Sequence, residues 1–132
     1  MIHTTHGKAI TAYKTLGEIW TKGFLPSELR AMIYLRDQLN PEVQFHDMKL
    51  SELIQKYNPK RLENGTLQFD LPEDAEAFKK DIDEIQNMEI DIDADPVIID
   101  TEKHTAAALV NKEDTMISPD QVDRLAGFME LV

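Results

Sequence analysis

Residues 72 to 94 read PEDAEAFKKDIDEIQNMEIDIDA, and the period of their hydrophobic residues changes from one end to the other. Pro72 and the two acidic residues after it are typical of a helix start. Apolar residues then recur at helical spacing, namely Ala75, Phe78, Ile82 and Ile85. From Glu89 to Ala94 apolar and acidic residues alternate, as in a strand with one buried face. The stretch therefore predicts a helix followed by a strand, within an α+β fold.

A second alternating segment precedes this helix. Residues 66 to 71 follow the turn signal Glu63-Asn64-Gly65 and place Leu67, Phe69 and Leu71 on one face. Strand, helix and strand within about thirty residues fit a βαβ unit, but a meander with the helix laid across it fits equally. After Pro96, residues 97 to 99 predict one further short strand.

The chain before residue 58 predicts a layer of helices. Apolar residues recur at three- and four-residue spacing from Ala9 to Trp20, Gly23 is a plausible helix end, and Pro26 opens a second helix. Asn40-Pro41 repeats the start signal. Because a residue before proline avoids the helical region, we expect a break or a sharp turn at Asn40.

The C-terminal part adds one more helix. Ser118-Pro119-Asp120-Gln121 is a capping box with proline in the first turn, whereas residues 106 to 110 fit either a strand or a helix. No repeat or linker divides the chain. We therefore expect a single, mainly helical α+β domain with a small two- or three-stranded sheet. Its parts are a helical layer over 8–58, an acidic strand-helix-strand unit over 66–100 and a C-terminal helix over 118–130.

The net charge is concentrated in one segment. The chain of 132 residues has 14 basic and 25 acidic side chains, for a net charge of −11. Residues 70 to 102 contain thirteen of the acidic and two of the basic side chains, while residues 1 to 69 are close to neutral. Because phosphate contacts need clustered Lys and Arg, we expect no direct binding to nucleic acid or to anionic membranes.

The absence of cysteine excludes a disulfide framework, thiol catalysis and zinc sites with thiolate ligands. The first residues lack the basic start and apolar run of a secretory signal, and no window is long and apolar enough to span a membrane. We therefore expect a cytoplasmic protein, placed in the host cell cytoplasm if the chain is viral.

One acidic pattern resembles a calcium-binding loop. Asp91, Asp93, Asp95 and Glu102 occupy the acidic positions of a twelve-residue loop. The sixth place, however, holds Pro96, which cannot adopt the positive φ that the loop requires there. We interpret Asp91 and Asp93 instead as the solvent face of a strand, and we expect no dedicated metal site and no cofactor.

The remaining polar residues do not indicate an enzyme. His3 and His6 fall in a segment that we expect to be a disordered, solvated tail. His46 and Asp47 are adjacent on a predicted helix and so do not face each other. No serine lies in a glycine-flanked elbow, and the five glycines are too scattered for a phosphate-binding loop. We therefore expect a protein without catalytic residues.

The acidic segment itself allows two interpretations. Its side chains are Asp81, Asp83, Glu84, Glu89, Asp91, Asp93 and Asp95. They are either a solvated face that keeps the protein soluble, or a surface that presents carboxylates to a basic groove, as protein mimics of DNA do. We favour the first, because residues 1 to 69 do not share the acidic character.

The order of parts resembles a group of phage proteins. A helical pair ending in Leu53-Ile54-Gln55-Lys56-Tyr57-Asn58 is followed by the turn at residues 63 to 67, the helix at 72 to 85 and the strand at 88 to 92. This layout is similar to small uncharacterised proteins of tailed phages and prophages of Gram-positive bacteria. The resemblance covers residues 30 to 95 and supplies no activity, but it implies a viral origin and a non-enzymatic role.

Together these features favour a non-enzymatic, phage-type accessory protein that binds another protein, in particle assembly or on a host factor. The expected anchors are the aromatic residues of the helical layer, Trp20, Phe24, Tyr34 and Phe45, which must then be exposed. A second copy of the chain is another possible partner. The alternatives are an acidic anti-defence inhibitor that occupies a nucleic-acid-binding site on a host enzyme, and a protein that binds divalent metal.

The proline in the acidic loop leads to a first prediction. Calorimetric titration with calcium should show no binding in the micromolar range, because Pro96 prevents the loop from closing around the ion. Micromolar binding that Asp93→Ala abolishes would contradict this interpretation.

Overall fold

The structure is a computed structural model in which residues 1–100 and 117–132 are described. In chain order its elements are β1 (Ile2–Thr5), α1 (His6–Ile19), α2 (Pro26–Tyr57), β2 (Lys60–Arg61), β3 (Leu67–Gln68), α3 (Pro72–Gln86), β4 (Glu89–Ile92), β5 (Val97–Ile99), α5 (Pro119–Arg124) and β6 (Met129–Leu131). Residues 106 to 110, whose sequence fits either a strand or a helix, lie outside the described residues.

The strands form three separate sheets of two strands each. β1 and β4 are antiparallel, with Ile2 opposite Ile92, and β2 and β3 form an antiparallel hairpin. β5 and β6 are parallel, with Val97 opposite Met129. The expected mainly helical α+β domain with a small sheet is therefore confirmed.

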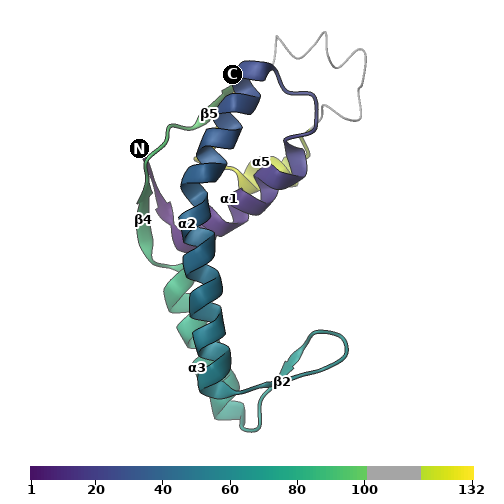
Figure 1. The fold of residues 1–132 in the computed structure, drawn as a ribbon, viewed down its shortest axis with the longest axis vertical. Helices are drawn as coiled ribbons and strands as arrows, with labels where there is room; N and C mark the ends of the chain where they lie inside the picture. Colours follow the sequence, from purple (N-terminus) through teal and green to yellow (C-terminus); the bar gives the residue numbers. More distant parts are fainter. Residues whose placement is uncertain (101–116) are drawn as a thin grey trace.

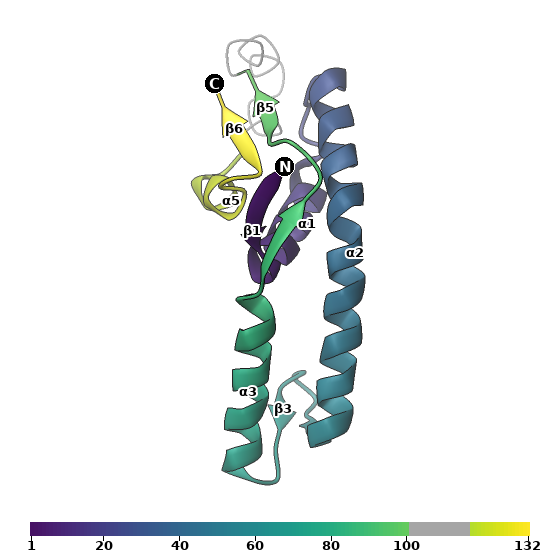
Figure 2. The same cartoon turned by 90° about the vertical axis from the view of Figure 1, so that its left-hand side faces the viewer.

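Helix α2 runs almost the whole length of the molecule (Figure 1). Its first half packs on α1 and β5. We call this half, together with α1, α5 and the sheets β1–β4 and β5–β6, the head. Its second half lies beside α3, with the hairpin β2–β3 near the far end, as Figure 2 shows. We call residues 41 to 88 the arm. No helix in the described part of the chain is long and apolar enough to cross a membrane.

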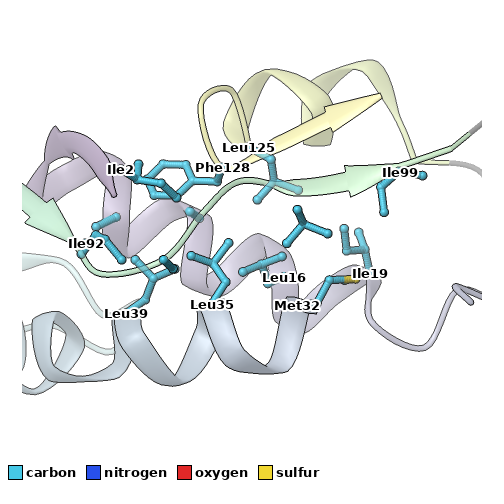
Figure 3. Close-up of a cluster of buried hydrophobic side chains, with 14 residues drawn as sticks. Ile2, Leu16, Ile19, Met32, Leu35, Leu39, Ile92, Ile99, Leu125 and Phe128 are labelled. Atoms are coloured by element: carbon cyan, nitrogen blue, oxygen red, sulfur yellow. The ribbon is translucent and has the colours of Figure 1, made fainter. Parts of the chain in front are cut away.

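The hydrophobic core lies entirely in the head (Figure 3). α1 and α2 contribute one side of it, and the sheets and the C-terminal segment contribute the other. Leu16, Leu35, Leu39 and Phe128 are among its fully buried side chains. The carboxylate of Glu28, itself buried, accepts hydrogen bonds from the backbone N–H of Leu25 (2.9 Å) and of Asp100 (3.3 Å), which ties the start of α2 to the end of β5.

The expected break at Asn40 does not occur, because α2 continues through Pro41. A proline inside a helix removes one hydrogen bond and clashes with the preceding turn, which costs about 3 kcal/mol. Tertiary contacts on both sides of Pro41 offset this cost. Leu39 is buried in the core before it, and Glu42 and His46 bind the side chain of His6 after it. Local preference is overridden here by packing.

The segment around α3 forms neither a βαβ unit nor a meander of adjacent strands. β3 pairs with β2, whereas β4 pairs with β1, which lies at the other end of the chain. The expected strand over residues 66 to 71 is reduced to Leu67–Gln68, and Leu71 is 54% exposed. A two-stranded hairpin that touches α3 through the Phe69 ring buries only part of an apolar face.

The capping box at Ser118 is confirmed, since Ser118 Oγ accepts from the backbone N–H of Gln121 (3.1 Å) and the Gln121 side chain accepts from that of Ser118 (3.1 Å). Helix α5 is shorter than the expected 118–130, since it covers only Pro119–Arg124. Gly127, at φ 86°, then turns the chain into strand β6. This turn places Phe128 in the core.

The contrast between head and arm leads to a second prediction. Leu35→Ala in the head should lower the free energy of unfolding by about 2–5 kcal/mol, because it opens a cavity in a closed core. Ile82→Ala on α3 should cost about 1 kcal/mol, since its side chain is only half-buried. Urea denaturation measures both values. Equal losses would show that the arm has a core of its own.

Candidate functional site

The arm has an apolar side but no core. None of the residues from Asn40 to Asp91 is buried. The apolar stripe of α3 does face α2, but its members Ala75, Phe78, Ile82 and Ile85 are only half-buried. Two helices side by side leave open the groove that a third helix fills in a bundle. The two helices of the arm therefore pack on each other but leave their shared apolar side partly exposed.

A groove of about 580 Å³ lies between α2 and α3. Its apolar lining residues are Phe45, Leu53, Ile85 and Met88, and its charged lining residues are Lys49, Glu52, Lys56, Asp81 and Glu84. Along α2, Phe45, Lys49, Leu53 and Lys56 follow one another at three or four positions and so share one helix face. Met88, at the head end, is 42% exposed.

The tip of the arm is closed by a hydrogen-bonded aromatic cluster. The Tyr57 hydroxyl donates to Asp81 Oδ2 at 2.7 Å, and Lys56 Nζ lies 3.6 Å from the same oxygen. The bond to Asp81 raises the pKa of Tyr57. The Tyr57 and Phe69 rings both pack on Phe78, with centroids 6.0 and 5.1 Å away. These contacts join α2, α3 and the hairpin.

The base of the arm is held by the buried side chain of His6, the first residue of α1. Its Nδ1 lies 3.0 Å from Glu42 Oε2, and its Nε2 lies 3.2 Å from His46 Nδ1. The His6 ring also stacks on His46 and meets the edge of Phe45. The backbone N–H of His6 donates to the carbonyl of Met88 at 2.9 Å. One residue thus joins the head to both helices of the arm.

The chemistry of these contacts determines which ring nitrogens of His6 and His46 carry a proton. An ionised carboxylate only accepts hydrogen bonds, so Nδ1 of His6 donates to Glu42. With both rings neutral, Nε2 of His6 is then the acceptor, and His46 donates to it from Nδ1. In this arrangement Nε2 of His46 carries the free lone pair.

Protonation of His46 is unfavourable in the folded state. Burial of the ring is the main reason that the pKa of His46 is lowered, and the neighbouring His6 lowers it further. Asp47 on α2 acts in the opposite direction, and Lys14 on α1 in the same direction as burial. Within the described residues, His6 is the one hydrogen-bond partner of His46, and no hydroxyl is in position to be activated. The arrangement therefore holds α1 and α2 together.

The four predicted aromatic anchors do not form one surface. Trp20, 38% exposed, flanks the Arg36 guanidinium, which also lies over the Tyr13 ring. Tyr34, 53% exposed, donates its hydroxyl to the carbonyl of Asp93 at 3.3 Å. Phe24 packs against the core. Of the four, Phe45 alone lines the groove of the arm.

The predicted acidic residues lie on two elements and the bend that follows them. Asp81, Asp83 and Glu84 are on α3, Glu89 and Asp91 are on β4, and Asp93 and Asp95 follow β4. Asp91 Oδ1 lies 2.7 Å from Nδ1 of His3, whose pKa this contact raises. Asp95 Oδ1 is 3.4 Å from the amino terminus. Part of the acidic face is thus compensated within the chain.

The candidate metal ligands are not assembled by the described residues. Asp91 is engaged by His3 and Asp95 by the amino terminus, while Glu102 lies outside the described part of the chain. In residues 1–100 and 117–132, no group of three or more His, Asp or Glu side chains is arranged to hold a metal ion.

The expectation that His6 lies in a disordered, solvated tail was wrong. For that reason the contacts at the base of the arm were not predicted. Residues 2 to 5 form strand β1, because β4 offers them an alternating partner. A signal for the site was present on α2: Glu42 and His46 are four residues apart and share a helix face. The third member, His6, is distant in sequence and has no local signal.

Comparison of the chain with protein-family models, with curated proteins and with solved structures found no match.

The contacts of His46 and His3 lead to a third prediction: the two histidines should change stability with pH in opposite directions. His46 has a folded-state pKa below its ordinary value of 6.5, so the unfolded chain binds more protons. Stability should fall as the pH drops below about 6.5. His46→Asn, which keeps a donor near the position of Nδ1, should reduce this acid loss.

His3 is the matched control, because its folded-state pKa is raised by Asp91. The stability that His3 contributes is complete below about pH 6.5 and is lost as the pH rises through the raised pKa of His3. His3→Asn should therefore flatten the alkaline side of the profile and leave the acid side unchanged. Urea titrations from about pH 5 to 8.5 measure both limbs. An acid limb that His46→Asn leaves unchanged would contradict the assignment.

Proposed function

We propose that this chain is a non-enzymatic accessory protein that acts by binding another protein, and that the arm is its binding surface. The observation that supports this most directly is the absence of any buried residue between Asn40 and Asp91, in a segment that has apolar stripes on both helices. Apolar surface gains about 25 cal/mol per Å² when it is removed from water. A partner helix or surface that covers the groove would supply that gain.

The resemblance to phage and prophage proteins supports the same proposal, because residues 30 to 95 include the whole arm. On this view the protein works in the cytoplasm, in the assembly of a particle or on a host factor. The alternative of an acidic inhibitor predicts a different contact surface, namely the exposed carboxylates on β4 and in the bend after it, such as Asp93.

Site-specific photo-crosslinking tests this proposal. A benzophenone amino acid is placed at Met88, which lines the groove, or at Met48, which is 52% exposed on the same arm but does not line it. In cells that naturally make the protein, Met88 should give a protein adduct and Met48 little or none, because only the groove is covered.

A third position, Asp93, separates the two functions. Adducts from Asp93 alone would support the acidic inhibitor instead of the arm. Equal adducts from Met88 and Met48, or none at any position, would count against binding through the groove.

A further inference from the structure

The groove of the arm has the dimensions of a short helix. Its α2 wall extends from Phe45 to Lys56, which corresponds to roughly 16 Å along a helix axis, or about three turns. Two antiparallel helices with an open seam accept a third helix whose apolar side chains enter that seam. The lining residues Phe45, Leu53, Ile85 and Met88 supply the apolar contacts.

An extended peptide fits this surface less well. Strand addition needs a free strand edge beside the binding surface. The strands of the arm, β2 and β3, are two residues long and belong to the hairpin, and neither lines the groove. The walls are instead the helices α2 and α3, with Met88 just beyond the end of α3.

The charges at the groove indicate the character of the helix that fits it. Lys49 Nζ is paired with Glu52 at 3.2 Å, and Lys56 Nζ lies 3.6 Å from Asp81, so both lysines of the lining are compensated. Glu84 has no ion-pair partner among residues 1–100 and 117–132. The arm as a whole has eleven acidic and six basic side chains. A basic helix is therefore attracted, and another arm of this kind is repelled.

We propose that the groove binds an amphipathic helix of about three turns, whose apolar stripe is flanked by Lys or Arg on the side that meets α3. This inference rests on the proposed function and specifies the chemistry of the partner. The basic side chains lie against the α3 wall, beside Glu84, and the apolar stripe covers Met88 and its neighbours.

Two synthetic peptides of about 14 residues test the proposal. They share one leucine stripe and a helix-stabilising staple, but one has arginine and the other glutamate along the flank. Fluorescence anisotropy with the full chain should show the arginine peptide binding at least about tenfold more tightly, and weakening several-fold between about 0.05 and 0.5 M salt.

Matched variants locate the site. Met88→Asp should reduce binding of the arginine peptide at least about tenfold, and Glu84→Gln by about two- to fivefold, because they remove an apolar and a charged contact. Met48→Asp and Glu76→Gln are the controls, since both positions are exposed and neither lines the groove. All four substitutions are at exposed positions, so the fold should tolerate them.

The outcomes are distinguishable from those of the crosslinking experiment. Equal affinity for the two peptides, no binding, or identical effects of the groove and control variants would overturn the basic-helix proposal. Sedimentation that shows a dimer lost on Met88→Asp would identify a second copy as the occupant and also overturn it. In each of these cases an adduct from Met88 would still support the arm as a protein-binding surface.

Discussion

The contact of His6 with Glu42 and His46 determines where α2 leaves the head. A buried imidazole must have both nitrogens satisfied, since an unpaired buried donor or acceptor costs about 1–3 kcal/mol. In this protein both partners are on α2, one turn apart, within the five residues that follow Pro41. His6 is also the first residue of α1, and its backbone N–H donates to the carbonyl of Met88. The direction of the arm therefore depends on one side chain in the head.

The arm is fixed at its two ends and open along its length. At the base, α1 approaches α3 so closely at Gly7 that a Cβ there would lie 3.1 Å from the Cβ of Gln86. At the tip, Tyr57 and Asp81 hold the two helices together. Between these points the apolar residues that line the groove stay partly exposed, namely Phe45, Leu53, Ile85 and Met88. A surface that is already ordered loses less conformational entropy on binding than a segment that has to fold first, which suits the arm to recognition.

The sequence predicts those elements whose signals are local. The proline at the start of α2, the acidic first turn of α3, the alternation of β4 and the capping box at Ser118 were all readable. The elements that were missed depend on distant partners. β1 is a strand only because β4, some 85 residues later, pairs with it, and β6 depends in the same way on β5. Pro41 has the local signature of a helix start, but the contacts of His6 and Leu39 keep α2 continuous. In the candidate site, the i and i+4 spacing of Glu42 and His46 was visible, whereas the groove required knowing that α3 lies against α2.

The acidic side chains of α3 and the apolar groove beside them have opposite effects on self-association of the protein. An open apolar seam between two helices is a self-association hazard, because the seam of a second copy is equally apolar. The excess of carboxylates on the arm opposes that pairing, since each arm presents like charge to the other. The same charge favours a basic partner. Solubility and the proposed selectivity are therefore not competing explanations of the acidic segment: carboxylates that keep two arms apart would also disfavour an acidic helix in the groove between α2 and α3.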